Sequence, residues 1–263
     1  MEWKEKVVWV VGASTGIGRA LALNLGSKGC TLILSSRDLR KLQEVQAQVN
    51  SQNCHILELD LEKVDTLAEK VSLAQRFVGR IDVVFLNGGI SQRSSASETL
   101  LDVDRRLMEI NYFSYVQLTK CLLPSMIEQR GGHFVVTSSL SGKFGFKLRS
   151  SYSASKHALH GFFESLRLEE VASGIKVTII CPGLIKTDIS LNALTADGSK
   201  QNSMDENQAQ GVSAEFCAQK MIVAVEKNKL EAVVGGKERY SVLLSRLFPL
   251  YLYKLLLKRD ARG

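Results

Sequence analysis

The sequence predicts an α/β fold in which helices cover both faces of a parallel β-sheet. Short apolar runs alternate along the chain with amphipathic stretches of helical length, the pattern of strands joined by crossover helices. The apolar runs are continuous, as in Val7-Val8-Trp9-Val10-Val11, which indicates parallel strands buried on both faces. No Pro- or Ser-rich linker and no internal repeat divides the 263 residues, so we expect residues 1–263 to form a single domain.

The elements follow one another with few interruptions. The expected strands cover residues 6–11, 31–35, 54–59, 81–86, 132–138, 176–181 and 231–234. The expected helices cover residues 17–28, 39–51, 64–77, 102–129, 152–172 and 215–228. Pro124 should disturb the end of the long fourth helix, because proline cannot donate the helical hydrogen bond. Residues 188–212 are polar and aperiodic, which is typical of a lid or a mobile loop over a site.

Composition excludes several classes of protein. Hydrophobic residues make up 45% and charged residues 23%, which is typical of a globular chain and unlike a disordered one. No run approaches the ~20 apolar residues that span a bilayer. The charged start passes directly into a strand, so we expect no signal peptide, although a trimmed native anchor stays open. The net charge of +7 comes from dispersed basic residues without interleaved aromatics, so we expect no nucleic-acid partner.

The cysteines and histidines show no metal-ligand spacing, and we expect no metal site. Scattered, unpaired cysteines are typical of reduced thiols, which favours a cytoplasmic location. The cysteines are Cys30, Cys54, Cys121, Cys181 and Cys217.

Tyr152 and Lys156 lie four residues apart in an expected helix and therefore share one face. A phenol has an ordinary pKa of about 10, and a neighbouring positive charge favours its ionised form. The pair would then donate and accept a proton near neutral pH. On its own, this spacing is more typical of a half-exposed aromatic residue beside a solvated charge.

A glycine-rich turn follows the first expected strand, with the pattern Gly12-x-x-x-Gly16-x-Gly18. Glycine lets the backbone turn tightly and approach a pyrophosphate, and the N-terminus of the following helix favours an anion. This order of strand, turn and helix indicates a dinucleotide site.

The end of the second expected strand indicates which dinucleotide binds. A carboxylate there would accept hydrogen bonds from an adenosine ribose, whereas a cation accommodates a 2′-phosphate. The chain has Ser36 and Arg37 at this point and Arg40 one turn later, with no carboxylate at the strand end. Because a guanidinium suits phosphate, we expect NADP(H) in preference to NAD(H).

Further motifs occur in a fixed order along the chain, and Ser139 precedes Tyr152 by 13 residues. Together with the glycine turn, they resemble the short-chain dehydrogenase/reductase family over residues 6–235. The motifs are Asp60-Leu61, Asn87-Gly88-Gly89, Asn111, Ser138-Ser139 and Pro182-Gly183. Within the family, the chain is most similar to the dehydrogenase/reductase member 7 group, on Asn87-Gly88-Gly89-Ile90-Ser91-Gln92-Arg93-Ser94 and Ser155-Lys156-His157-Ala158-Leu159.

The resemblance implies a single-domain, doubly wound Rossmann-type sheet of about seven strands with the cofactor across its C-terminal edge. It implies that Tyr152 is the general acid or base and that Lys156 lowers the Tyr152 pKa and holds the nicotinamide ribose. Ser139 would hydrogen-bond the substrate oxygen, and Asn111 would anchor a water that relays protons to Lys156. The implied cofactor contacts are Gly12, Ser14, Thr15, Ile17, Gly18, Asp60, Leu61, Asn87, Gly88, Tyr152, Lys156, Pro182, Gly183, Ile185 and Thr187.

The resemblance favours an NADPH-dependent carbonyl reductase. An apolar pocket suits a hydrophobic ketone or aldehyde, such as a steroid, a retinoid or a lipid-derived carbonyl compound. The alternatives are a 3-oxoacyl-carrier reductase and a catalytically idle NADP-binding regulator. The apolar side chains after the fifth expected strand would equally serve to pack the loop that carries them onto the domain. The expected substrate contacts are Ser91, Gln92, Ser139, Phe144, Leu148 and Tyr152.

Two surfaces predict contacts with larger partners. The helices over residues 102–129 and 152–172 resemble the dimer-forming helices of the family, so we expect a homodimer or a homotetramer. The C-terminal extension over residues 243–263 begins as an apolar, aromatic run flanked by cations. It would lie in a bilayer interface as a peripheral membrane contact, or pack on the lid or on a partner subunit.

Overall fold

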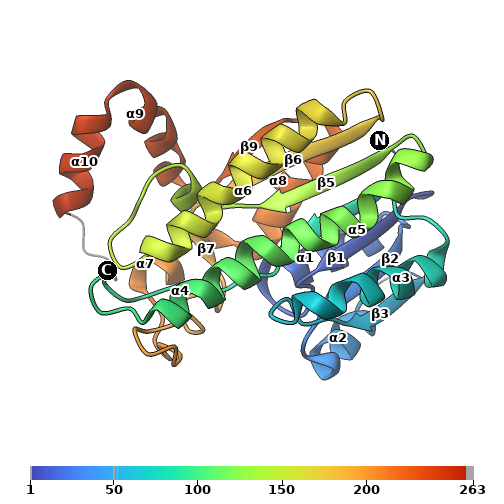
Figure 1. The fold of residues 1–263 in the computed structure, drawn as a ribbon, viewed down its shortest axis with the longest axis horizontal. Helices are drawn as coiled ribbons and strands as arrows, with labels where there is room; N and C mark the ends of the chain where they lie inside the picture. The colour runs from blue at the N-terminus through green and yellow to red at the C-terminus, as the bar shows by residue number, and fades with distance from the viewer. Residues whose placement is uncertain (1, 50, 52, 259–263) are drawn as a thin grey trace.

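The computed structural model describes residues 2–49, 51 and 53–258. They form one large parallel sheet and the helices and loops around it (Figure 1). The seven strands of this sheet run in the order β3-β2-β1-β4-β5-β6-β9. They are β1 Val7–Val11, β2 Thr31–Ser36, β3 Cys54–Glu58, β4 Val83–Leu86, β5 Gly132–Thr137, β6 Ile175–Pro182 and β9 Glu231–Val234. A small second sheet pairs β7 Ile185–Lys186 with β8 Val212–Ser213. The predicted α/β architecture with about seven parallel strands is confirmed.

Helices cover both faces of the large sheet. Helices α1, α2 and α8 pack on one face, and α3, α5 and α6 pack on the other (Figure 1). The helices are α1 Gly16–Gly26, α2 Leu39–Gln46, α3 Leu67–Val78, α4 Leu101–Met108, α5 Ser114–Glu128, α6 Ser150–Glu169, α7 Glu206–Ala209, α8 Ala214–Glu226, α9 Ser241–Leu247 and α10 Pro249–Lys258. Single turns of 3-10 helix are η1 Val64–Thr66, η3 Leu140–Gly142 and η4 Lys237–Tyr240, and η2 Glu109–Phe113 is a π-helical turn.

Strand β1 shows why apolar residues occupy successive positions. Val8 and Val10 belong to the core under α1, α2 and α8, whereas Trp9 and Val11 belong to the core under α3, α5 and α6. Successive side chains of a strand point to opposite faces, and here both faces are covered. Each fully buried side chain of this kind contributes roughly 1.5–3 kcal/mol.

The strand order places a crevice at the carboxyl edge of the sheet. Strand β1 pairs with β2 on one side and with β4 on the other. The chain therefore winds outward from β1 in two opposite directions. In sheets of this kind, ligands bind between the loops that diverge at such a point.

One expected helix is shorter in the structure. The helix predicted over residues 39–51 ends at Gln46, and the N–H groups of Gln48 and Val49 both donate to the Val45 carbonyl in the turn that follows. The chain must turn here because β3 begins only a few residues later, beside β2. Residue 50 of the predicted range lies outside the described residues.

The disturbance expected at Pro124 is absent. Pro124 lies inside α5, and the helix continues to Glu128. Leu122 and Met126 flank the proline and are fully buried in the core. Their burial, at roughly 1.5–3 kcal/mol each, offsets the cost of about 3 kcal/mol of a proline inside a helix.

The polar segment over residues 188–212 folds against the body of the protein. Leu194 is buried and forms parallel and antiparallel bridges with Gln92 and Lys200, respectively. Helix α7 and strand β8 follow, so the segment has structure of its own. Its hydrogen bonds to the loop after β4 place it next to the carboxyl edge of the sheet.

The C-terminal helices α9 and α10 extend away from the large sheet and are red in Figure 1. Val242 and Leu252 are buried. The exposed apolar residues are Leu243, Leu247, Phe248, Leu250, Tyr251, Tyr253, Leu255 and Leu257. Within residues 2–49, 51 and 53–258, no helix has the length and apolarity needed to cross a membrane. The bilayer and protein contacts expected for this run stay predictions, and residues 259–263 lie outside the described residues.

Candidate active site

A cavity of about 820 Å³ opens at the carboxyl edge of the sheet. The glycine turn, the ends of β2, β4, β5 and β6, part of the segment over residues 188–212 and the first turns of α6 line it. Cavities of this volume hold cofactors and small substrates. It therefore lies where the strand order predicts a ligand.

The turn after β1 fits a bound pyrophosphate through its backbone. Gly12 and Gly16 adopt φ angles of +84° and +52°, which strain a residue with a side chain. A Cβ on Gly12 would lie 2.5 Å from Gly88 Cα, and one on Gly18 would lie 1.9 Å from the Gly12 carbonyl oxygen. The side chain of Thr15, at the start of α1, caps no described N–H group. The first N–H groups of α1 are therefore available to an anion.

Most of the residues predicted to contact a cofactor line this cavity. They are Gly12, Ser14, Thr15, Ile17, Ser36, Arg37, Asp60, Leu61, Asn87, Gly88, Tyr152, Lys156, Pro182, Gly183, Ile185 and Thr187. Gly18 and Arg40 do not line it. Gly18 instead allows the turn to close on Gly12.

A cation other than Arg40 lies beside Arg37. The Arg40 side chain is 80% exposed, and its Nε lies 4.0 Å from Glu44 Oε1. Lys41 lines the cavity instead. Asp38 caps α2 by accepting a hydrogen bond from the Lys41 N–H at 3.0 Å, which holds Lys41 at the end of β2. Sequence reasoning missed Lys41, although an Asp three positions ahead of it at a helix start was a usable signal.

Tyr152 and Lys156 are both buried on the face of α6 that lines the cavity. Lys156 Nζ donates to the Thr137 carbonyl at 2.9 Å, and burial lowers the pKa of Lys156 to about 7. Burial raises the pKa of Tyr152 above its ordinary value of 10, and contact with Ser139 and the charges of Arg149 and Arg93 act in the opposite direction. The lowering of the Tyr152 pKa by Lys156 stays a prediction.

Asn111 lies behind the cavity rather than in its wall. It is fully buried in the π-helical turn η2, an irregularity frequent at functional sites. Its Oδ1 accepts a hydrogen bond from the Ile90 N–H at 2.9 Å, and its Nδ2 donates to the Ile90 carbonyl and to Ser155 Oγ. The Asn111 amide therefore ties the loop after β4 to α6.

Gln92 was predicted to contact substrate, but it does not line the cavity. Its side chain is fully buried, and Gln92 Oε1 accepts hydrogen bonds from the N–H groups of Ser151 (2.9 Å) and Tyr152 (3.2 Å). Gln92 therefore caps the N-terminus of α6. A buried amide whose oxygen already pairs with two N–H groups has little capacity left for a substrate.

Phe144 and Leu148 are also absent from the residues that line the cavity, whereas Phe146 is present. The ring of Phe144 packs against that of Phe146 at 5.0 Å. The Leu148 carbonyl accepts a hydrogen bond from the Ser94 N–H at 3.2 Å, and Arg149 lines the cavity next to it. Phe144 thus packs within its loop, and the Leu148 backbone ties this loop to Ser94, while Ser91 and Ser139 line the cavity.

Three charged residues of the cavity wall were missed by sequence reasoning. Arg93 Nε donates to Asp205 Oδ2 at 2.7 Å, and Arg149 Nη2 donates to the same oxygen at 3.2 Å. Arg93 and Asp205 are buried, and all three residues line the cavity. No local pattern joins them, because they come from three distant loops.

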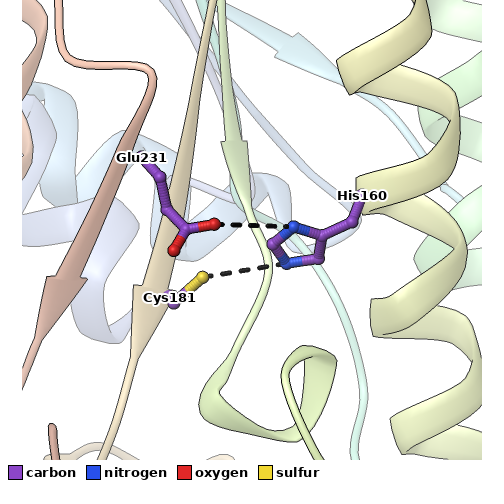
Figure 2. Close-up of side chains that lie close together, drawn as sticks. All are labelled: His160, Cys181 and Glu231. Carbon is purple, nitrogen blue, oxygen red and sulfur yellow. Dashed lines mark hydrogen bonds and ion pairs between the residues drawn. The ribbon is translucent and has the colours of Figure 1, made fainter. Parts of the chain in front are cut away.

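A second polar cluster contains His160, Cys181 and Glu231 (Figure 2). His160 Nε2 lies 3.8 Å from Cys181 Sγ, and His160 Nδ1 lies 3.7 Å from Glu231 Oε2. The same Glu231 oxygen accepts a hydrogen bond from Lys143 Nζ at 2.7 Å, and burial raises the pKa of the Cys181 thiol to about 12. The cluster therefore holds an ion pair and a protonated thiol, and it joins α6, β6 and β9.

Comparison with known proteins identifies the family of this chain. The sequence profile of the short chain dehydrogenase family matches residues 6–197. Dehydrogenase/reductase SDR family member 7B of Mus musculus is 43% identical over 237 residues, covering 88% of this chain and 73% of that protein. Dehydrogenase/reductase SDR family protein 7-like of Drosophila melanogaster is 36% identical over 264 residues, covering 98% of this chain and 81% of that protein.

Solved structures agree with the fold. A short-chain dehydrogenase from Streptomyces avermitilis superposes with a TM-score of 0.81 at 27% identity, covering 95% of each chain. A short chain dehydrogenase/reductase from Burkholderia phymatum, solved in complex with NAD, also gives a TM-score of 0.81, covering 100% of this chain and 98% of that one. At 19% identity, the second likeness concerns the fold alone.

We predict that Gln92→Met destabilises the protein. Met is nearly the same size as Gln but leaves the N–H groups of Ser151 and Tyr152 without their acceptor, and each buried unpaired group costs roughly 1–3 kcal/mol. Urea unfolding measures the change in the free energy of unfolding. Gln43→Met is the matched control, because Gln43 is exposed. Equal stability of the two variants would contradict the capping role.

Proposed function

The chain belongs to the short chain dehydrogenase family, NAD(P)-dependent oxidoreductases that act on CH–OH and C=O groups, and we propose that it reduces the carbonyl of a hydrophobic ketone or aldehyde with NADPH. One observation carries the proposal. Ser139, Tyr152 and Lys156 line the same cavity as the glycine turn and Arg37. A proton donor, a hydroxyl donor and a dinucleotide site therefore share one space.

We assign the proton chemistry to Tyr152 and Ser139. The nicotinamide supplies the hydride when the cofactor is bound. Negative charge develops on the carbonyl oxygen, and two hydrogen-bond donors aimed at that oxygen stabilise it. Ser139 Oγ already accepts a hydrogen bond from the Ser141 N–H at 3.1 Å, so its own proton remains to donate to the substrate. The Tyr152 phenol then gives its proton to the same oxygen.

Lys156 and Asn111 support this transfer in the proposal. Lys156 holds the nicotinamide ribose hydroxyls and, when charged, lowers the Tyr152 pKa. Asn111 can make four hydrogen bonds, and three of them go to Ile90 and Ser155 among the described residues. One acceptor position on Oδ1 is left for the water that would relay protons. The chain has all four of Asn111, Ser139, Tyr152 and Lys156, which favours an active enzyme over an idle regulator.

The apolar part of the cavity wall supports a hydrophobic substrate. Leu140, Phe146 and Leu194 line it, and Leu256 brings α10 to it from the C-terminal end of the chain. An aliphatic or ring carbon skeleton would replace water against these side chains. Ser139 and Tyr152 would then select the carbonyl group by donating hydrogen bonds to its oxygen.

The cations at the end of β2 support NADPH over NADH. Arg37, Ser36 and Lys41 line the cavity there. Asp38 is the nearest carboxylate in sequence, but it is engaged in capping α2. Arg37 Nε lies 4.0 Å from Asp60 Oδ1 and Lys41 Nζ lies 3.8 Å from Asp38 Oδ2, so both carboxylates near this strand end already face a cation. A 2′-phosphate would bind these cations, whereas a ribose diol would have to compete with them for a carboxylate.

We predict that Tyr152→Phe abolishes turnover. The substitution removes only the phenolic oxygen, so the proton source is lost while the cavity keeps its shape. NADPH oxidation should be measured across a panel of ketones and aldehydes, and NADPH binding by fluorescence should be nearly unchanged. A fully active Tyr152→Phe variant would contradict the assignment of Tyr152 as the general acid.

Cofactor choice gives a second test. Arg37→Ala should weaken NADPH binding roughly 10- to 100-fold, because a charge-assisted hydrogen bond is lost, and should affect NADH far less. Arg40→Ala is the matched control, since Arg40 is 80% exposed and does not line the cavity. Dissociation constants from fluorescence titration measure both effects. Equal losses for the two cofactors would show that Arg37 does not contact the 2′-phosphate.

We also propose a homodimer through the outer faces of α5 and α6. Phe113, which ends η2 directly before α5, is 48% exposed, and Leu168, near the end of α6, is 77% exposed. Exposed apolar side chains on neighbouring long helices favour burial against a second copy.

Light scattering on the purified protein tests this proposal. The wild type should have the mass of a dimer, and the double variant Phe113→Glu with Leu168→Glu should have that of a monomer, because buried unpaired carboxylates disfavour association. Leu230→Glu is the control, being 61% exposed but outside both helices. A monomeric wild type, or a double variant that stays dimeric, would rule out this interface.

A further inference from the structure

The formal charges of the ionised side chains near Tyr152 do not cancel. Asp205 accepts hydrogen bonds from both Arg93 and Arg149, so two guanidinium groups face one carboxylate. Gln201 Nε2 also donates to Asp205 Oδ1, at 3.0 Å. Two positive charges and one negative charge leave this group with a net charge of +1 in the cavity wall.

Asp205 and Arg149 are both ionised at neutral pH. Burial acts to raise the pKa of Asp205, but the hydrogen bond and the charge of Arg93 outweigh it and hold the pKa below its ordinary value. Burial, followed by the charge of Arg93, lowers the pKa of Arg149 to about 10, which still leaves it protonated. The Arg149 charge is therefore real and only partly compensated.

Arg93 and Arg149 use their donors differently. Arg93 is fully buried, and it donates to Asp205, to Ser91 Oγ at 2.8 Å and to the Gln92 carbonyl at 2.6 Å. Arg149 makes one hydrogen bond to the described residues, from Nη2 to Asp205. Since a guanidinium has five N–H donors, Arg149 keeps several of them free.

The free side of Arg149 faces the cavity. The side chain is 16% exposed, lines the cavity and lies three residues before Tyr152. Its guanidinium carbon lies 5.7 Å from the centre of the Phe146 ring, and stacking of this kind fixes the plane of the group. A rigid, partly desolvated fork of donors beside the proton source is suited to an anionic group of the substrate.

We propose that Arg149 is a specificity residue that binds a carboxylate of the substrate, so that the enzyme acts on carbonyl compounds that are also carboxylic acids. This rests on the proposed carbonyl reduction. A planar carboxylate matches the fork of the guanidinium and carries the single negative charge that the group lacks. The apolar wall of Phe146 and Leu256 would hold the carbon chain of such an acid.

Two other cations of the cavity wall are less suited to this role. Lys147 Nζ donates to the Leu257 carbonyl at 2.7 Å, which engages it with α10. Lys200 lines the cavity from the exposed side of the segment over residues 188–212. Because an exposed ammonium remains hydrated, it gains little from a bound anion. Arg149 combines burial, a fixed plane and proximity to Tyr152.

The test compares each acid with its neutral partner. The probes are ω-oxo carboxylic acids of about 4 to 12 carbons and their methyl esters, each reduced with NADPH. We expect the wild type to prefer an acid over its ester in kcat/KM by roughly 10- to 100-fold, the range of a hydrogen bond to a charged group. Arg149→Met should bring the ratio to about 1, mainly by raising KM for the acid. Arg149→Lys should keep part of the preference, because the charge remains but the fork is lost.

Lys200→Met is the control, since it removes one positive charge from the same cavity wall and should leave the ratio unchanged. Binding is measured separately from turnover. In the presence of NADPH, decanoate should raise the melting temperature of the wild type but not of Arg149→Met, and methyl decanoate should not distinguish the two proteins. This readout tests Arg149 even if every probe is a poor substrate.

The possible failures are distinct. If the wild type reduces acids and esters equally well, or if Lys200→Met and not Arg149→Met removes the preference, the carboxylate site is overturned and carbonyl reduction stands. If no probe oxidises NADPH and yet decanoate stabilises only proteins with Arg149, the anion site stands and the proposed reaction fails. If decanoate stabilises Arg149→Met as much as the wild type, the anion site is overturned whatever the activity.

Discussion

The buried ammonium of Lys156 is the constraint around which this site is arranged. Its Nζ donates to the Thr137 carbonyl and lies 5.7 Å and 5.9 Å from the ring centres of Tyr115 and Tyr152. No ion pair joins it to a carboxylate of the described residues. An ammonium without a counter-ion is costly to bury, and the lowered pKa of about 7 reflects this cost. Other interactions of the fold must therefore contribute enough stability to offset this cost and to keep α6 in place.

Buried polar side chains supply this support. Gln92 caps the first turn of α6, the Asn111 amide reaches Ser155, and Ser138 Oγ donates to the Lys156 carbonyl at 3.1 Å. His160 in turn bonds Ser138 Oγ at 3.0 Å. Each of these groups is paired, and unpairing one costs more than a single hydrogen bond contributes on average. Residues with no direct part in the chemistry thus fix where Tyr152 and Lys156 lie.

Local sequence patterns were sufficient for the sheet. Continuous apolar runs such as that of β1 reflect burial on both faces, and this depends only on neighbouring positions. The glycine turn could be predicted from its spacing directly after a strand, whereas the roles of Asn111, Ser139, Tyr152 and Lys156 came from the family resemblance and stay predictions. Arg93 and Asp205 lie 112 positions apart, so their pairing depends on the tertiary fold. The same holds for Gln92, whose polar side chain looked suited to substrate until the first turn of α6 was placed against it.

The charges of the cavity bear on the role that the family resemblance gives to Lys156. A charged Lys156 lowers the Tyr152 pKa, but burial alone leaves the Lys156 pKa at about 7, so the amine is only partly charged at neutral pH. Bound anions favour the charged form of a nearby amine. Lys156 therefore lowers the Tyr152 pKa only to the extent that it is charged, and an anion bound close to its ammonium would increase that extent.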